Sequence, residues 1–554
     1  MLTRLTGGRL FDPAHGVEGR VRDLYVRDGR IIDAPADAAG AHTIDVTGRV
    51  VMAGAIDLHT HIGGGKVNLA RLMLPEDHRR VRYERTELTR SSCGHAAPGT
   101  LAAGYRYAEM GYTACFEPAM LPINARQTHL ELGDTPIVDK GCYALLGNDD
   151  FFLRMLAGGE AQARINDYVG WILDCTQAIA IKVVNPGGIS AFKFNQRRLD
   201  VDEPHAYYRV TPRRVLHTLA RAVHELGVPH GLHVHGCNLG VPGNVDTTLA
   251  TIEAAEGLPI HLTHVQFHSY GTEGDRKFSS AAARIAEAIN ANANVSADVG
   301  QIMFGQTVTA SGDNMMQFRN AELGSPRKAV VMDIECDAGC GVVPFRYRDQ
   351  SFVNALQWAI GLEIFLSVRD PWRIYLTTDH PNGAPFTSYP HLIRLLTDRT
   401  FRDQMFQTIN PDARAASILG SLTREYSLYE IAIMTRAGPA RTLGLTDRGH
   451  LGAGAAADIV VYRDEVDRER MFSTPEYVFK DGELIVRDGR LVKITGGSSV
   501  HAVKPEYDRS IEGKVAEYFE RYQTTSARGF RIGGDELCEC GSRLIVHPCR
   551  GASR

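Results

Sequence analysis

Two histidines stand one residue apart at the end of an apolar segment, AIDLHTH (residues 55–61). Alternate residues of a β-strand point to the same face, so His59 and His61 are predicted to project together from one strand end. Imidazole is the commonest metal ligand in proteins. Paired histidines also line strand faces without binding anything, so this motif needs partners elsewhere in the chain before it indicates a metal site.

A lysine lies inside another apolar segment. Lys182 is flanked by aliphatic residues in IAIKVVN (179–185), where a buried ammonium group would be costly. One chemical solution is reaction of the amine with CO2, which gives an anionic carbamate whose two oxygens can bridge two cations. Two alternatives are open: a lysine that forms a Schiff base with a substrate, and a lysine whose side chain reaches solvent from a strand end.

Three further candidate ligands come at the ends of later apolar segments. His235 ends GLHVH, His264 lies in PIHLTHV, and Asp379 ends RIYLTTD. His233 and His261 are possible substitutes for the two histidines, but they come earlier in their segments and would pack deeper in the fold. For Asp379 the structural alternative is a helix or turn cap.

The order of these residues along the chain is H-x-H, Lys, His, His, Asp. Such a set has enough ligands for two zinc ions, with Zn–N distances of about 2.0–2.1 Å and the ions about 3.5–4 Å apart. Water between two such ions ionises near pH 7, roughly. Asp379 is then placed to take its proton and to pass it to a leaving amine. The set therefore predicts a metallohydrolase that cleaves an amide-like bond.

These residues need a fold that brings strand ends together. Between residues 53 and 440, short apolar segments alternate with helical stretches such as RRVLHTLARAVHELG. The segments are AIDLHTH, YTACFEP, CYALLGN, IAIKVVN, GLHVHG, PIHLTHV, ANVSADV and RIYLTTD. This alternation predicts a (β/α)8 barrel with loop insertions, whose active site lies at the C-terminal ends of the strands. An open doubly wound sheet is the alternative, and VVMDIE (330–335) competes with ANVSADV for the seventh strand.

The two ends of the chain differ from this centre. Residues 1–52 and 441–500 contain short β segments punctuated by turns, such as Asp28-Gly29 and Asp481-Gly482. The economical interpretation is one small β-sandwich built from both ends, since two separate modules would each have a very small core. Residues 501–554 form a C-terminal extension, for which we expect a loose reduced tail. Its Cys538, Cys540 and Cys549, with His547, are a weak match to a zinc knuckle.

Composition narrows the class of protein. The chain has 554 residues, 44% of them hydrophobic, and a net charge of -4, which predicts more than one domain and no affinity for nucleic acid. The longest apolar stretch, residues 355–368, is too short to span a bilayer. The N-terminus lacks the apolar run of a secretory signal, and ten cysteines do not form a disulfide framework over this length. We therefore expect a cytoplasmic protein.

The ligand order resembles that of the amidohydrolase superfamily, which includes dihydroorotases and hydantoinases, and LTGGRLFDP, VRDGRI and LGLTDRGHLGAGAAADIVVY resemble its β-sandwich segments. Longer stretches are similar to the A-type subunits of formylmethanofuran dehydrogenase and of the formyltransferase/hydrolase complex. They are GGGKVNLARLMLPEDHR, GYTACFEPAM, IKVVNPGG, HVHGCNLG, THVQFHSYG and TTDHPNGAPF. The resemblance implies the metal ligands His59, His61, carboxylated Lys182, His235, His264 and Asp379, with Asp379 also the catalytic base.

The resemblance also implies a substrate and partners. Such subunits interconvert an N-formylmethanofuran-type coenzyme with formate and the free amine, inside a hetero-oligomeric complex of one-carbon metabolism. The coenzyme carries an anionic glutamate-rich tail, which basic loop residues after the first strand could contact: Lys66, Arg79, Arg80 and Arg85. A solvated basic loop is the alternative. His268 and Asn238 follow metal-binding strands and are candidates to donate a hydrogen bond to the formyl oxygen.

Three functions are therefore weighed. The first is a formyl-amide hydrolase within a complex, favoured by the long loop after the first strand and by TTDHPNGAPF. The second is a free-standing cyclic amidase of the hydantoinase or dihydroorotase type. The third is a non-catalytic scaffold subunit. The chain contains no C-x2-C-x2-C run for an iron–sulfur cluster, so any redox chemistry would belong to partner subunits.

Overall fold

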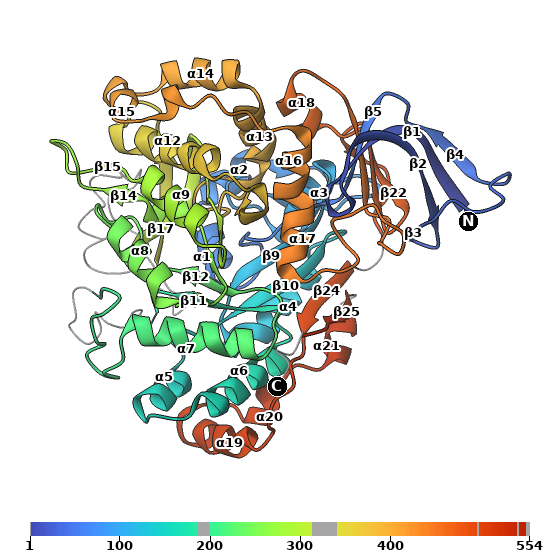
Figure 1. Cartoon of the computed structure of the whole chain (residues 1–554). Coiled ribbons are helices and arrows are strands. Elements are labelled where there is room, and N and C mark those ends of the chain that lie inside the picture. Colours follow the sequence, from blue (N-terminus) through green and yellow to red (C-terminus); the bar gives the residue numbers. More distant parts are fainter. Residues whose placement is uncertain (1, 187–198, 313–340, 496–497, 540–541, 550–554) are drawn as a thin grey trace.

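Eight short parallel strands form the centre of the molecule, and each pairs with the next one along the chain (Figure 1). The strands are β6 (Ala55–Asp57), β9 (Tyr112–Met120), β10 (Asp139–Leu145), β11 (Ala180–Val184), β12 (Leu232–His235), β13 (Ile260–Leu262), β16 (Val295–Asp298) and β19 (Ile374–Tyr375). A parallel bridge between Thr60 and His380 joins the residues that follow β6 and β19. A sheet whose strands follow one another in chain order, and whose first and last strands are bridged, is a barrel and not a doubly wound sheet. The predicted fold class is therefore confirmed.

The computed structural model describes residues 2–186, 199–312, 341–495, 498–539 and 542–549. Each of the eight predicted strand segments overlaps one of the barrel strands, and ANVSADV supplies the seventh, β16. The competing segment VVMDIE lies outside the described residues. Among the described residues, no helix is both long enough and apolar enough to cross a bilayer.

Strands and helices follow from their residue patterns. Strands β9, β10 and β11 are buried along their whole length, as expected for parallel strands covered on both faces. Helices pack outside them: α3 (Thr100–Glu109), α4 (Ala125–Gly133), α6 (Gln162–Thr176), α7 (Pro212–Glu225), α8 (Val245–Ala254), α9 (Ala282–Ala291) and α12 (Phe352–Ser367). Helix α7 is an example of how the sequence sets a helix. The Thr211 hydroxyl caps its N-terminus by accepting from the Arg214 backbone N–H, and Pro212 is its first residue. Leu216 and Leu219 lie on its buried face.

Strands from the two ends of the chain share one sheet beside the barrel. They are β1 (Leu2–Asp12), β2 (Val17–Arg27), β3 (Arg30–Ile32), β4 (His42–Asp45), β5 (Arg49–Ala53), β20 (Ile459–Arg463), β21 (Tyr477–Lys480), β22 (Glu483–Arg487) and β23 (Arg490–Leu491). Strand β5 pairs with β20, with Met52 opposite Val460. Leu5, Val51 and Ile459 belong to one hydrophobic core. Blue N-terminal and orange C-terminal strands accordingly lie together at the right of Figure 1.

The C-terminal segment differs from the loose tail that we expected. Strand β24 (Ser498–Val503) pairs in parallel with β10 of the barrel and with β25 (Ser542–His547). Between them lie α19 (Ile511–Tyr522), α20 (Ala527–Phe530) and α21 (Gly534–Glu539). Trp171 of α6 contacts Phe519 and stacks on Phe530, so apolar packing holds the segment against the barrel. Cys538 and Cys549 are free thiols, and Cys540 lies outside the described residues.

A buried ionic network connects the barrel, the shared sheet and β24. The Asp139 carboxylate, at the start of β10, accepts hydrogen bonds from Arg448 Nε at 2.8 Å, Lys480 Nζ at 3.0 Å and the Ser499 backbone N–H at 2.8 Å. Lys480 also donates to Asp458 at 3.2 Å. Burial alone would raise the pKa of Asp139, but Lys480 and Arg448 outweigh it and hold that pKa well below its usual range. These charges therefore depend on one another for neutralisation.

Removing one cation from this network should be strongly destabilising. Lys480→Met leaves the carboxylates of Asp139 and Asp458 buried without one of their donors, so the free energy of unfolding should fall by about 3–5 kcal/mol. Lys493→Met is the control, because Lys493 pairs with Glu483 on the surface with about half of its side chain exposed, and it should lose at most about 1 kcal/mol. Urea unfolding followed by circular dichroism compares them. Equal losses in the two variants would contradict the assignment of this network as a structural connection.

Candidate metal centre

His59 and His61 leave the barrel just after β6, and a buried carboxylate holds the turn. The Asp57 carboxylate accepts from the His59 backbone N–H at 3.1 Å and from the Tyr107 hydroxyl at 2.7 Å, and Tyr389 donates to it as well. Burial raises the pKa of Asp57 to about 7, against the lowering effect of these hydrogen bonds. The segment that carries the two histidines is therefore anchored by side chains on neighbouring helices.

Asp379 follows β19 and faces both histidines. Its Oδ1 lies 3.0 Å from His59 Nε2 and 3.3 Å from His61 Nε2, and all three side chains are buried. The His61 backbone N–H donates to the His380 carbonyl at 2.9 Å, so barrel closure sets this contact. Burial opposes ionisation of Asp379, but the imidazoles of His264 and His59 outweigh it and keep its pKa well below its usual range. The carboxylate is thus a ready cation ligand.

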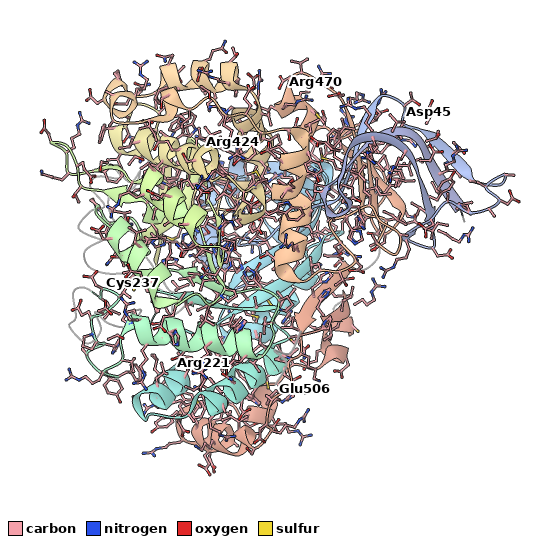
Figure 2. All side chains as sticks on the ribbon, in the orientation of Figure 1. Asp45, Arg221, Cys237, Arg424, Arg470 and Glu506 are labelled. Carbon is pink, nitrogen blue, oxygen red and sulfur yellow. The ribbon has the colours of Figure 1, made fainter. Side chains whose placement is uncertain are left out.

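Three other imidazoles gather beside this pair. His235 ends β12, and His264 directly precedes the short helix Val265–His268. The ring centres are 4.6 Å apart for His235 and His264, 5.2 Å for His235 and His268, and 5.4 Å for His264 and His268. One ligand atom of each of these residues lies within 4.8 Å of the others, and the same holds for His59, His264 and Asp379. Because His264 belongs to both groups, the two groups are adjacent. Cys237, two residues beyond His235, marks this end of β12 in Figure 2.

The donor set fits divalent cations. Several buried ring nitrogens have no hydrogen-bond partner among the described residues: His61 Nε2, His264 Nδ1, and both nitrogens of His268. An unsatisfied buried polar atom is costly and uncommon, and burial lowers the pKa of His264 and of His268 well below the usual range, which favours the ring form with a free lone pair. Neutral imidazole and carboxylate are zinc-type ligands. The arrangement can therefore hold cations next to one another.

Lys182 lies in the middle of β11 and is buried. The charged groups of Asp379 and Lys66 are near enough to shift the pKa of Lys182. Lys182 therefore lies at the same centre. Burial is the largest effect on the Lys182 amine and contributes most to lowering its pKa to about 8. A larger fraction of the amine is then neutral than in an ordinary lysine, and the neutral amine is the form that reacts with CO2.

Two carboxylates that the sequence analysis missed support the ligands. Glu117 of β9 lies with Oε1 2.8 Å from His61 Nδ1, and its Oε2 accepts from the Ile62 backbone N–H at 2.8 Å. Asp298, at the end of β16, accepts from the His264 backbone N–H at 2.9 Å. Burial opposes ionisation of Asp298, but His59 and His261 outweigh it and lower its pKa to about 2. The available signal was an acidic residue within an otherwise apolar strand segment, YTACFEP or ANVSADV.

The other predicted site residues are placed as follows. Asn238, three residues beyond His235, donates from its side-chain amide to Asp200 at 2.6 Å and to Thr247 at 3.2 Å. Lys66 is buried in α1 (Gly65–Met73). The remaining three basic residues are exposed, on α2 (Pro75–Arg80) and in the loop that follows: Arg79, Arg80 and Arg85. His233 and His261 lie deeper in the barrel, within contact of His59 and Asp298 respectively.

A hairpin after β16 covers the β19 side of the centre. It consists of β17 (Gly305–Gly312) and β18 (Gly341–Tyr347). The Thr307 hydroxyl donates to the Pro381 carbonyl, and the Tyr347 hydroxyl donates to the Asn382 carbonyl at 3.2 Å. These contacts support the loop that begins with Asp379.

The family follows from comparison with known proteins. Residues 42–486 match the sequence model of the amidohydrolase family. This chain belongs to the amidohydrolase family. It is 44% identical over 525 residues to the A-type subunit of the formyltransferase/hydrolase complex Fhc of Methylorubrum extorquens, and the match covers 94% of each chain. It is 38% identical over 553 residues to protein FwdA of Methanocaldococcus jannaschii, and that match covers 96% of each chain.

A solved structure agrees with these relatives. One chain of the crystal structure of the formyltransferase/hydrolase complex (FhcABCD) from Methylorubrum extorquens, in complex with methylofuran, superposes on this amidohydrolase with a TM-score of 0.92 and 43% identity. The superposition covers 99% of this chain and 100% of that one. The resemblance stated from the sequence motifs is therefore confirmed.

Glu117 should control how tightly this amidohydrolase binds metal. Glu117→Gln removes the carboxylate that orients His61, so the affinity for zinc should fall by about 10- to 100-fold, the usual cost of losing such an outer partner. Glu363→Gln is the control: Glu363 is equally buried and accepts from the Ile418 backbone N–H at 2.9 Å, but it belongs to α12. Competition with a chromophoric chelator measures both affinities. An unchanged zinc affinity in Glu117→Gln would contradict this role.

Proposed function

We propose that this amidohydrolase hydrolyses the formyl C–N bond of an N-formylmethanofuran-type coenzyme to formate and the free amine, or catalyses the reverse reaction. It would do so as the A-type subunit of a one-carbon complex. The observation that carries the proposal is the full-length similarity to a chain of the FhcABCD complex, whose crystal structure contains methylofuran. The centre described above supports it, because it combines cation ligands with an ionised carboxylate.

The six predicted ligands would hold two divalent ions, which we propose to be zinc. His59, His61 and Asp379 form one side of the centre, and His235 and His264 the other. Lys182, as a carbamate, would add anionic oxygens to this set of ligands. When bound, such ions polarise a carbonyl and increase the acidity of water.

Asp379 has the proton-transfer role in this proposal. Its ionised carboxylate accepts a proton from the water that attacks the formyl carbon. It then gives that proton to the amine nitrogen as the C–N bond breaks, because an unprotonated amide nitrogen is a poor leaving group. The products are formic acid, which ionises to formate, and the amine. His268 is proposed to donate a hydrogen bond to the formyl oxygen, since its ring is buried and has no partner among the described residues. The side-chain amide of Asn238 already donates to Asp200 and Thr247, so it would have to exchange one of these partners to donate to the substrate.

The coenzyme's anionic tail is proposed to follow the basic loop after β6. Arg79, Arg80 and Arg85 are exposed and available to carboxylates. Lys66 is buried and close enough to Lys182 to influence its pKa, so we place it at the reacting end of the substrate. The remaining subunits of the complex are the proposed protein partners, and the cytoplasm the proposed location.

The two alternatives predict different behaviour. A free-standing cyclic amidase would hydrolyse hydantoins or dihydroorotate without partners. A scaffold subunit would bind no metal and would hydrolyse neither substrate. Zinc analysis and turnover of both substrate classes by the purified chain, alone and with its co-purifying proteins, separate the three functions.

Asp379→Asn tests the catalytic role directly. The variant keeps the size of the side chain and one oxygen but loses its basicity, so kcat for the formyl coenzyme should fall by a factor of about 10² to 10⁴. KM should change less, because the proton transfer belongs to the transition state. Asp149→Asn is the control: Asp149 is also buried and caps α5 (Asp150–Ala157) by accepting from Phe152, and its loss should affect stability alone. A near wild-type kcat in Asp379→Asn with normal zinc content would make another group the base.

Lys182→Ala tests the carbamate. We expect the variant to lose zinc and activity, and short carboxylic acids in excess to restore part of both by replacing the carbamate oxygens. Lys140→Ala is the matched control, since Lys140 is buried in β10, has a pKa lowered by burial to about 8 and donates to the Thr135 carbonyl. It should keep its zinc. Nuclear magnetic resonance after exchange with labelled bicarbonate should show a carbamate carbon in the wild type. An unmodified Lys182 in the zinc-loaded chain would refute this assignment.

A further inference from the structure

A chain of buried imidazoles runs from the metal centre into the barrel. His59 Nδ1 lies 2.9 Å from His233 Nε2, and His233 Nδ1 lies 2.9 Å from His230 Nε2. All three side chains are fully buried. His230 stands just before β12, at the opposite end of the barrel from Asp379, and its ring interacts with the backbone of Thr442 in α17 (Gly438–Leu443).

A neutral imidazole carries one N–H and one lone pair. If His59 Nε2 gives its lone pair to a cation beside Asp379, then Nδ1 must carry the hydrogen. His233 Nε2 is at the right distance to accept it, which puts the hydrogen of His233 on Nδ1, facing His230 Nε2. Both links then have one donor and one acceptor, and the hydrogen of His230 falls on Nδ1, for which no partner among the described residues meets hydrogen-bond geometry.

Two other groups lie near His59 Nδ1. Asp298 Oδ2 is 3.5 Å away, beyond the usual hydrogen-bond range, and already lies 3.1 Å from His261 Nε2. The Thr263 hydroxyl is 2.5 Å away, but a hydroxyl both donates and accepts. It is therefore compatible with either tautomer of His59 and selects neither.

His59, His233 and Asp298 also have one ligand atom each within 4.8 Å of the others, so a further cation there is the alternative to a hydrogen-bonded chain. Both nitrogen pairs in the chain are separated by 2.9 Å, which is the usual length of a hydrogen bond. The zinc count of the wild-type chain separates the two arrangements.

We propose that His233 and His230 are positioning residues that hold His59 in the tautomer and orientation in which Nε2 is free to bind a metal. The inference rests on the proposed function, because it presupposes a cation at His59. It gives the two histidines of the H-x-H motif different supports: Glu117 for His61 and a histidine chain for His59. A carboxylate partner attracts the proton of its imidazole strongly, whereas a neutral imidazole partner fixes the tautomer without adding a buried charge.

The test compares zinc affinity in the full-length chain and its variants by chelator competition. His233→Leu removes the acceptor, so the zinc dissociation constant should rise by about 10- to 100-fold. His233→Gln offers an amide oxygen to His59 and an amide N–H to His230, and should recover much of the affinity. His230→Leu, which breaks only the outer link, should give a smaller loss in the same direction, and it decides the matter if His233→Leu does not fold.

His129→Leu is the matched control, because His129 is buried with Nε2 2.8 Å from the Thr176 carbonyl but lies on α4. It should lower the melting temperature of the metal-free chain and leave zinc affinity unchanged. The visible spectrum of the cobalt-substituted chain should shift in His233→Leu and stay unchanged in His129→Leu, since only the former alters a ligand's environment.

Three outcomes would overturn the inference while leaving the proposed function intact. The first is wild-type zinc affinity in His233→Leu or, where that variant does not fold, in His230→Leu. The second is a loss of zinc affinity in Thr263→Val that equals the loss in His233→Leu. The third is a third zinc ion in the wild-type chain. Fewer than one zinc per wild-type chain would instead refute the proposed function.

Discussion

The site depends on the contact that closes the barrel. Thr60 pairs with His380, and the His61 N–H donates to the His380 carbonyl, so the ends of the first and last strands are fixed to each other. This is what puts the Asp379 carboxylate between His59 and His61, although about 320 residues of chain separate them. Without closure these groups would lie at opposite edges of an open sheet, and no cation could bind them together.

Closure places charge and lone pairs close together in a buried volume, and this has a cost. The carboxylate of Asp379 is stabilised by imidazoles on both sides, while several imidazole nitrogens remain without partners among the described residues. A cation relieves both conditions at once, because it supplies positive charge to the carboxylate and an acceptor for the lone pairs. The centre is therefore suited to bind metal, and Glu117, Asp298 and His233 contact the residues that we propose as ligands.

The opposite end of the barrel is organised differently. There Asp139, Arg448 and Lys480 neutralise one another, and the network ties β10 to the shared sheet and to β24. Buried charge at this end is paired within the protein, whereas at the metal end it is left to be paired by a ligand. The distinction follows from the general division of labour in such barrels, in which strand N-termini serve stability and strand C-termini serve chemistry.

The barrel, and the polar residues that meet at its strand ends, could be predicted from the order of residues along the chain. The eight segments alternate with helices at a spacing typical of parallel strands with crossovers, and His59, His61, Lys182, His235, His264 and Asp379 stand out because polar residues in apolar segments are costly. Other features became visible only in the folded molecule. Glu117 and His233 contact His61 and His59, which are distant from them in sequence, and β24 joins the barrel by pairing with a strand about 360 residues earlier. Such contacts form between segments that are far apart in sequence and close together in space. The residue pattern within one segment does not determine which other segment it will contact.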